Sequence, residues 1–464
     1  MFHELPIYFF QAIHKCTYLL DFYKLTCGSN IRMYSAIANF RLSLLFLFSA
    51  QFGFIFVASS NTTRPQKTVC KKPFIDILIS PVFENGVTNQ LELIWSIEDF
   101  IPGSMLILMN RGTGKAEYEY KLPGPMGFVD TNIAYKPLTT TYSFKKQSLE
   151  YYVELREAAS GSVLASSSME TNPTWMKDNA DVFSRMSIRE MMIPGTHDTG
   201  ASTEEDNMGE SRVQKYVMTQ DETVLNQLIL GIRSLDLRVA YYSVKNETSK
   251  LYLNHGLQSI CPFSVIVKDI KTFMENTREI VILDFHQFPM GFNGKIPNVK
   301  PHAILVEYLK QELEPYIAPA NLTWNAKLQD FWRINRTLII AYNHEETQDQ
   351  YSDILWLPVN QRWANAQDLY ALKHYMEVEF THPPWGPWAA MTELTATGMD
   401  IFTDDMKGLR TMASSVNKEV TFWFLGDWGN RAHIVACDFF RETSIVKTAI
   451  MWNLRKAKNS TCDI

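Results

Sequence analysis

The sequence Met192-Ile-Pro-Gly-Thr-His-Asp-Thr-Gly-Ala201 joins a short apolar run to a turn that carries a histidine and an aspartate. Three later segments repeat this arrangement, with charged residues or histidines in or just after an apolar run: Gly231-Ile-Arg-Ser-Leu-Asp-Leu-Arg-Val239, Leu253-Asn-His-Gly256 and Ile280-Val-Ile-Leu-Asp-Phe-His-Gln287. Short apolar runs bounded by turn residues are typical of buried strands. We therefore expect four strands that each deliver polar side chains to their ends.

Strand-like and helix-like segments alternate from about Trp175 to the end of the chain. The expected strands are residues 189–193, 232–239, 251–254, 280–285, 337–341, 420–425 and 434–436, and the clearest helices are 262–276 and 301–313. This alternation indicates βα units and a parallel sheet. About eight such units in roughly 290 residues predict a (βα)8 barrel of the TIM type over residues 175–464, with a doubly wound sheet as the alternative.

The preceding part of the chain has a different pattern. Residues 74–80, 91–97, 105–109 and 151–155 are strand-like runs, separated by turns rich in proline and glycine. Regular short strands in about 100 residues predict an all-β domain, an immunoglobulin-like sandwich over residues 61–174. We find no residues with evident chemistry in this segment, so a spacer or docking role is expected.

The first 60 residues are expected to be a leader. Residues 41–58 begin with an arginine and continue as an uncharged apolar run, and small residues follow at 58–60. This pattern predicts a signal peptide cleaved near residue 60, hence a secreted or extracellular protein. The alternative is an uncleaved anchor that tethers the protein to a membrane.

Two further features agree with secretion. Asn-X-Thr acceptor sequences, which predict a glycoprotein, begin at Asn61, Asn246, Asn321, Asn335 and Asn459. Four cysteines remain after the leader, namely Cys70, Cys261, Cys437 and Cys462, and they could form two disulfides in three connectivities. Cys437 lies in an apolar run, so a buried thiol is its alternative.

The overall composition excludes some partners. Hydrophobic residues make up 46% and charged residues 20%, as in a globular protein, and the formal net charge is -6. A nucleic-acid-binding protein held by a basic face is therefore not expected. No glycine-rich phosphate loop of the nucleotide-binding kind is present, so we expect no nucleotide cofactor.

The candidate site residues are the polar side chains of the expected strands. In a (βα)8 barrel the carboxyl ends of the strands build the active site. Two histidines there can act as base and acid across one phosphorus, and an arginine can neutralise the phosphoryl oxygens. An aspartate can orient one imidazole. The sequence therefore favours phosphodiester cleavage by this set: His197, Asp198, Asp236, Arg238, His255, Asp284, His286 and Asp438.

In combination and order, the four quoted segments resemble the X domain of phosphatidylinositol-specific phospholipase C. The subgroup called PI-PLC X domain-containing proteins, which resembles the small bacterial enzymes, is the best match. The resemblance implies that His197 takes the proton from the inositol 2-hydroxyl and that His255 protonates the lipid leaving oxygen. It further implies that Arg238, positioned by Asp198, stabilises the phosphate.

The resemblance also bears on the remaining polar residues. Asp236 lies two residues from Arg238, on the same face of a strand. His286 is expected to bind the inositol ring or to be a packed polar group, and Asp284 to bind substrate or support the fold. The bacterial type has a late aspartate that orients the base histidine; Asp438 is our candidate and Asp427 its rival.

The resemblance predicts a site that works without metal. Calcium-dependent relatives have an acidic ligand where this chain has Arg238. A calcium site needs several oxygen ligands, and a guanidinium puts a fixed positive charge in that place.

The function expected from these observations is a secreted enzyme that cleaves phosphatidylinositol or a glycosylphosphatidylinositol lipid at a membrane surface. One alternative is a metal-dependent glycerophosphodiesterase-like barrel, and another is an inositol-lipid-binding protein without activity. The tryptophan-rich stretches 356–363 and 383–388 are expected in loops at the mouth of the barrel, where tryptophan could meet a lipid interface or pack the loops.

Overall fold

The structure, a computed structural model, describes residues 72–82, 89–136, 142–202, 214–243, 250–294 and 300–458. The chain divides into two units, Met1–Gln66 and Lys67–Ile464, and every described residue belongs to the second. The expected leader, the acceptors Asn61, Asn246 and Asn459, and the cysteines Cys70 and Cys462 lie outside the described residues. Among the helices that are described, none is long and apolar enough to cross a membrane.

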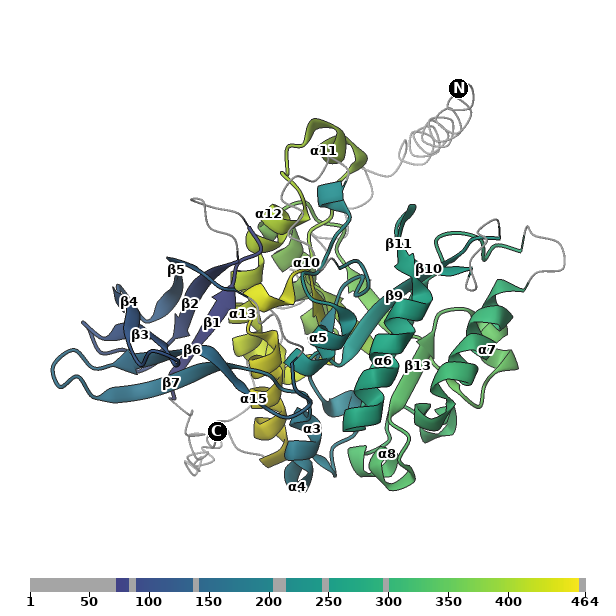
Figure 1. The fold of residues 1–464 in the computed structure, drawn as a ribbon, viewed down its shortest axis with the longest axis horizontal. Coiled ribbons are helices and arrows are strands. Elements are labelled where there is room, and N and C mark those ends of the chain that lie inside the picture. Colours follow the sequence, from purple (N-terminus) through teal and green to yellow (C-terminus); the bar gives the residue numbers. More distant parts are fainter. Residues whose placement is uncertain are drawn as a thin grey trace, which may run out of the picture. The chain divides into compact units, whose positions relative to one another are not determined.

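Seven antiparallel strands form two sheets in the first part of the second unit (Figure 1). One sheet has the order β1-β2-β5, with β1 (Phe74–Ile79), β2 (Gln90–Ser96) and β5 (Met126–Ala134). The other has the order β4-β3-β6-β7, with β3 (Met105–Asn110), β4 (Ala116–Lys121), β6 (Ser148–Arg156) and β7 (Val163–Glu170). The four expected strands are all present. The immunoglobulin-like identity of these sheets, and a domain boundary at residue 174, stay predictions.

Burial in these sheets follows the two-residue period of a strand. In β6, the side chains of Leu149, Tyr151, Val153 and Leu155 are buried, and the residues between them are more exposed. They pack in one apolar core with residues of the other sheet, among them Trp95.

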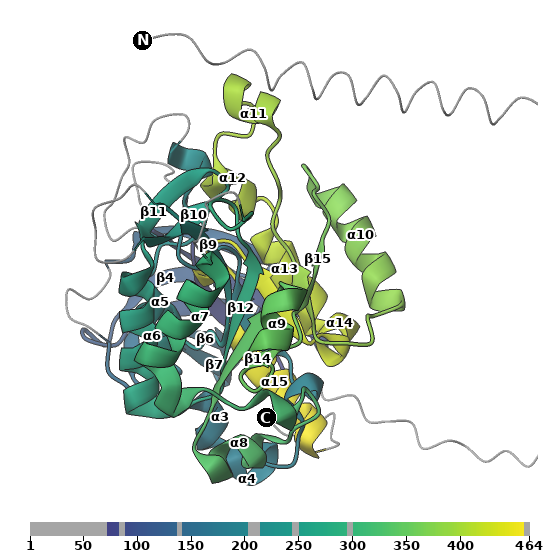
Figure 2. The same ribbon diagram turned by 90° about the vertical axis from the view of Figure 1, so that its right-hand side faces the viewer.

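The rest of the unit is a mixed α/β fold around a curled parallel sheet (Figure 2). The strand order is β14-β13-β12-β9-β8-β17-β16-β15. The strands are β8 (Ile193–Thr196), β9 (Ser234–Tyr241), β12 (Val281–Gln287), β13 (Leu338–Tyr342), β14 (Leu355–Trp356), β15 (Asn360–Trp363), β16 (Trp388–Met391) and β17 (Ile434–Cys437). All seven neighbouring pairs are parallel. Within the described residues no pairing joins β14 to β15, so the sheet is a curled one with two edges, and a closed barrel is not seen.

Helices connect these strands and surround the sheet. They are α3 (Trp175–Asp178), α4 (Ala180–Phe183), α5 (Val224–Leu230), α6 (Phe263–Thr277), α7 (Pro301–Leu313), α8 (Leu328–Ile334), α9 (Glu345–Gln350), α10 (Leu369–Thr381), α11 (Gly398–Thr403), α12 (Leu409–Ser414), α13 (Asn417–Leu425), α14 (Asp427–Arg431) and α15 (Ile445–Lys458). The expected helix at 301–313 has the bounds of α7, and the one at 262–276 differs from α6 by one residue at each end.

Three expected strands are corrected by the structure. Of the expected strand 189–193, only Ile193 lies in a strand, β8, because Ile188–Glu190 form a 3-10 helix. Residues 420–425 belong to helix α13, in which Asn417, Val420, Thr421 and Phe424 are buried at helical spacing. A short apolar run does not by itself distinguish a strand from a buried helix. Residues 251–254 are indeed in a strand, β10 (Leu251–His255), but it pairs antiparallel with β9 and with β11 (Gln258–Pro262). His255 is therefore delivered by a hairpin and not by a strand of the parallel sheet.

Candidate active site

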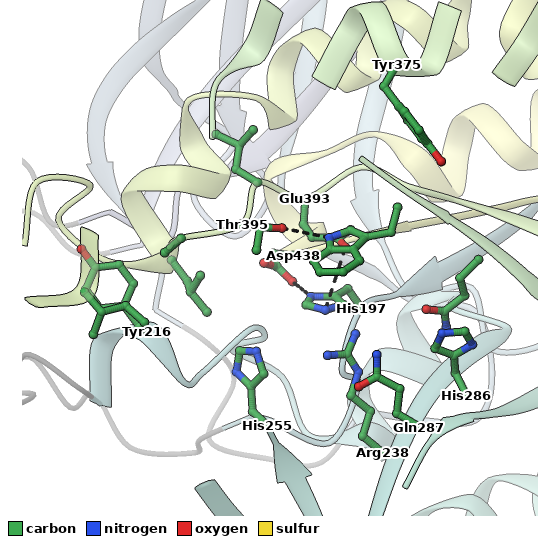
Figure 3. Close-up of a pocket in the computed structure, with 16 residues that line it drawn as sticks. His197, Tyr216, Arg238, His255, His286, Gln287, Tyr375, Glu393, Thr395 and Asp438 are labelled. Carbon is green, nitrogen blue, oxygen red and sulfur yellow. Dashed lines mark hydrogen bonds and ion pairs between the residues drawn. The ribbon is translucent and has the colours of Figure 1, made fainter. Parts of the chain in front are cut away.

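The carboxyl ends of the parallel strands and the tip of the β10–β11 hairpin enclose a cavity of about 300 Å³ (Figure 3). Its lining combines histidines, one arginine, carboxylates, aromatic rings and apolar side chains. They are His197, Tyr216, Arg238, His255, His286, Gln287, Gln361, Trp363, Tyr375, Glu393, Leu394, Thr395, Ala396, Ile401, Leu409 and Asp438. Of the eight residues expected at the site, five line this cavity.

His197 follows β8 and is held on both its backbone and its ring. Its backbone N–H donates to the Cys437 carbonyl, and its Nδ1 donates to Asp438 Oδ1 at 2.7 Å. Because Nδ1 carries the proton of this bond, Nε2 is the free ring nitrogen, and the ring lines the cavity. Burial favours the neutral ring, but the negative charges of Glu393 and Asp438 together outweigh it and raise the pKa of His197 to about 9.

His255, at the end of β10, is held in the same way. Its Nδ1 donates to the Val217 carbonyl at 2.6 Å, which leaves Nε2 free at the cavity. The ring centroids of His197 and His255 lie 6.0 Å apart, with the ring planes nearly perpendicular. Two imidazoles thus face one small space, each anchored through Nδ1.

Arg238, from β9, lies in the same cavity against two buried aspartates. Its Nη2 donates to Asp236 Oδ2 at 3.0 Å, and its Nε is 3.8 Å from Asp198 Oδ2. Burial opposes ionisation of Asp236, but the charges of Arg238 and His197 outweigh it and lower its pKa to about 2. Burial raises the pKa of Asp198, whose two carboxyl oxygens have no hydrogen-bond partner among the described residues.

His286 and Asp284 occupy different places. His286 lines the cavity, and burial lowers its pKa, which favours the neutral ring. Asp284 is buried and accepts a hydrogen bond from Gln361 Nε2 at 2.9 Å. Burial and the charge of Asp236 raise its pKa well above the usual range. The cavity lining does not include Asp198, Asp236 or Asp284. Asp236 contacts the lining residue Arg238, and Asp284 contacts the lining residue Gln361.

Of the two aspartates expected to orient His197, Asp438 is the one that contacts its ring. Asp438 directly follows β17 and holds the His197 ring. Asp427 is the first residue of α14, is exposed and does not line the cavity.

Glu393 is a cavity residue that the sequence did not predict. It follows β16 by two residues, is buried, and its Oε1 lies 3.9 Å from His197 Nε2. Burial raises its pKa to about 7, opposed by the charge of His197. The available signal is a carboxylate two residues after the apolar run Trp388-Ala-Ala-Met391, but a run of four residues is too short to predict a strand from sequence.

The tryptophan-rich stretches are split between the two ends of the sheet. Trp363, at the carboxyl end of β15, lines the cavity and donates through Nε1 to Thr395 Oγ1. Trp356 and Trp388 are buried. Trp385 is 91% exposed, but it precedes β16 and so lies at the amino end of that strand, away from the cavity. The expectation that residues 383–388 lie at the mouth is therefore wrong, because β16 begins within them.

The comparisons with known proteins bear on these motifs. The chain is 28% identical over 166 residues to PI-PLC X domain-containing protein 1 of Danio rerio, a match that covers 36% of this chain and 50% of that protein. It is 24% identical over 308 residues to PI-PLC X domain-containing protein 1 of Homo sapiens, covering 61% of this chain and 92% of that protein. The resemblance to PI-PLC X domain-containing proteins predicted from the four segments is thus confirmed. No protein-family model matches the sequence.

Among solved structures, phosphatidylinositol-specific phospholipase C from Staphylococcus aureus is similar. A mutant of that enzyme superposes with a TM-score of 0.44 at 16% identity, over 60% of this chain and 96% of the enzyme. A structure from a study of its membrane binding gives a TM-score of 0.46 at 18% identity.

Proposed function

We propose that the protein is a phosphoric diester hydrolase or lyase that cleaves an inositol phospholipid, phosphatidylinositol or a glycosylphosphatidylinositol, by acid–base catalysis with two histidines. One observation carries this proposal. His197 and His255 are both anchored through Nδ1 and present Nε2 to one cavity, beside the guanidinium of Arg238. The likeness to PI-PLC X domain-containing proteins supports the choice of lipid.

The proposed reaction is an intramolecular displacement at phosphorus. The inositol 2-hydroxyl gives its proton to His197 Nε2, and its oxygen forms a bond to phosphorus. The bond from phosphorus to the diacylglycerol oxygen breaks, and that oxygen takes a proton from His255 Nε2. The products are a cyclic inositol phosphate and diacylglycerol. Arg238 neutralises the phosphoryl oxygens, a role that suits a bidentate cation in a buried site.

The cavity also has an apolar side that suits a lipid. Leu394, Ala396, Ile401 and Leu409 line it, and Met399 and Phe402 on α11 are exposed beside Ile401. A membrane surface is the proposed partner, with the polar headgroup at the histidines and the glycerol side toward α11.

Metal independence is part of the proposal. The guanidinium of Arg238 lies against Asp236 and near Asp198, so the two carboxylates that could bind a cation already have one. Activity that requires added magnesium or calcium would favour the glycerophosphodiesterase-like alternative.

We propose further that the protein is secreted or extracellular, possessing a cleaved leader. Asn321 and Asn335, two of the predicted glycosylation acceptors, are exposed. Cys261 and Cys437 are free thiols in the structure, and Cys437 is buried, as its alternative reading expected.

One observation favours the second candidate, an inositol-lipid-binding protein without turnover. Because its pKa is raised to about 9, the His197 ring favours the protonated form at neutral pH, whereas a general base must be neutral. A protonated ring beside Arg238 suits the binding of an anion.

The deciding experiment is hydrolysis of phosphatidylinositol vesicles by the protein in excess EDTA, beside His197→Ala and His255→Ala. We expect turnover in EDTA for the wild type and a loss of at least about a thousandfold in each variant, because each removes one proton-transfer group. Binding of phosphatidylinositol without release of diacylglycerol would contradict catalysis and establish the binding protein. Turnover that EDTA abolishes would contradict the metal-independent mechanism.

A further inference from the structure

Glu393 gives His197 a second carboxylate, which lies near Nε2, whereas Asp438 is at Nδ1 (Figure 3). Asp438 Oδ1 is 2.7 Å from Nδ1, whereas Glu393 Oε1 is 3.9 Å from Nε2. The second distance is too long for a direct hydrogen bond. A single hydroxyl oxygen placed about 2.8 Å from both atoms would fit against the pair.

A second observation concerns Oε2, the other carboxylate oxygen of Glu393. Oε2 is buried and has no hydrogen-bond partner among the described residues. A buried carboxylate oxygen without a partner is energetically unfavourable, and such atoms are rare outside functional sites. The side chain lines the cavity, and Oε1, the oxygen nearer to His197 Nε2, is the one that a hydroxyl between the two residues would meet.

The strand register explains why Glu393 and Asp438 meet. Strands β16 and β17 are parallel, with Met391 opposite Ala436, and Glu393 and Asp438 each come two residues later. Residues two apart on a strand point to the same side. Both carboxylates therefore reach the same ring, one from each of two adjacent strand ends.

We propose, on the basis of the proposed function, that Glu393 contacts the substrate: its carboxylate accepts a hydrogen bond from a headgroup hydroxyl held against His197 Nε2. The occupant of this subsite is thus a polyol hydroxyl. In this arrangement Glu393 helps to position the hydroxyl and also sets the pH at which His197 becomes a base.

The other charges around His197 do not duplicate this role. The titratable and charged groups that face the ring come from β8, β9, β10, β12, β16 and β17, and they are Asp198, Asp236, Arg238, His255, His286, Glu393 and Asp438. Of the carboxylates, Glu393 and Asp438 are the two that raise the pKa of His197 most. Glu393 is the one on the Nε2 side.

The test replaces Glu393 by glutamine and by aspartate in the full chain. Histidine ring titrations are followed by NMR, and the His197 signal is identified by its absence in His197→Asn. We expect His197 to titrate near pH 9 in the wild type and at least one pH unit lower in Glu393→Gln, because a negative charge beside the ring is lost. Glu393→Asp keeps the charge and is expected to keep the high pKa.

The same signals report binding of the probe myo-inositol. Affinity for myo-inositol is expected to fall about tenfold in Glu393→Gln, as for the loss of one hydrogen bond to a charged acceptor. With phosphatidylinositol as substrate, the rising limb of kcat/KM against pH is expected to move to lower pH in Glu393→Gln, with a lower plateau. The control is Glu377→Gln, at an exposed position on α10, which should change none of these quantities.

The outcomes separate this inference from the proposed function. An unchanged His197 titration, or unchanged myo-inositol affinity, in Glu393→Gln would overturn the role of Glu393 even if the wild type is active. Absence of turnover in the wild type would overturn the proposed function, and the titration and myo-inositol binding would still decide the role of Glu393. A rate loss that is equal at every pH, with no shift of the limb, would mean a structural role only.

Discussion

At the scale of single residues, the candidate site depends on how each imidazole is anchored. Asp438 holds His197 through Nδ1, and the Val217 carbonyl holds His255 in the same way. A charged acceptor stabilises the imidazolium, whereas a neutral carbonyl only fixes the tautomer. The two histidines therefore differ in the charge of the Nδ1 partner, a carboxylate for His197 and a neutral carbonyl for His255.

Asp438→Asn tests this anchoring. The amide can present an N–H to Nδ1, which favours the wrong tautomer of His197 and removes a charge that stabilises its protonated form. We expect kcat for phosphatidylinositol to fall by about 10²–10⁴-fold with little change in KM, while the circular dichroism spectrum is retained. Asp427→Asn, at the exposed start of α14, is the matched control. Equal losses in both variants would contradict the assignment of Asp438.

At the scale of secondary-structure elements, the β10–β11 hairpin and helix α11 flank the cavity. Leu257, in the turn of the hairpin directly after His255 and Gly256, is 78% exposed, and Met399 and Phe402 of α11 are 66% and 77% exposed. Exposed apolar side chains next to a cavity are a common sign of an interaction surface. Both elements follow carboxyl ends of strands, so they lie on the site's side of the sheet.

The double variant Met399→Ser, Phe402→Ser tests α11 as a membrane contact. Each apolar side chain that inserts contributes up to about 1.5–3 kcal/mol, so binding to phosphatidylinositol vesicles is expected to weaken at least about tenfold. Hydrolysis of a soluble cyclic inositol phosphate should not change. Trp385→Ser removes a side chain that is still more exposed but lies at the opposite end of the sheet, and it should leave vesicle binding intact. Loss of binding in the Trp385 variant alone would place the membrane contact elsewhere.

At the scale of the whole described unit, a buried ion cluster joins the antiparallel sheets to the site. Lys418 Nζ lies 3.0 Å from Glu92 Oε1 of β2 and 2.6 Å from Glu442 Oε1. Asn417 Nδ2 donates to Glu442 Oε2 and to the carbonyl of Asp438. The sheets therefore brace the segment that carries Asp438, in addition to any docking role.

Lys418→Met tests this connection. Removing the cation leaves two buried carboxylates without their partner, and the free energy of unfolding is expected to fall by about 3–5 kcal/mol in urea denaturation. The control is Arg333→Met, which breaks an ion pair whose arginine is 75% exposed and should cost at most about 1 kcal/mol. A stability like that of the control would mean that the cluster does not contribute to the interface.

The local features of this protein can be predicted from neighbouring residues alone. The four motifs, the alternation of strands and helices, and the polar residues at the strand ends are patterns of neighbouring residues, so they can be read without coordinates. They located His197, Arg238, His255 and His286 at one cavity and Asp236 beside Arg238, whereas the place of Asp198 near Arg238 was implied by the family resemblance.

The contacts between residues far apart in the sequence depend on the folded chain. His197 and Asp438 are 241 positions apart, and Glu393 reaches the same ring from a strand too short to recognise. The apolar run 420–425 is a helix because its environment buries one helical face, and β10 turns back as a hairpin because it pairs with β9. Pairing, register and burial are properties of the packed chain, and no window of sequence contains both partners.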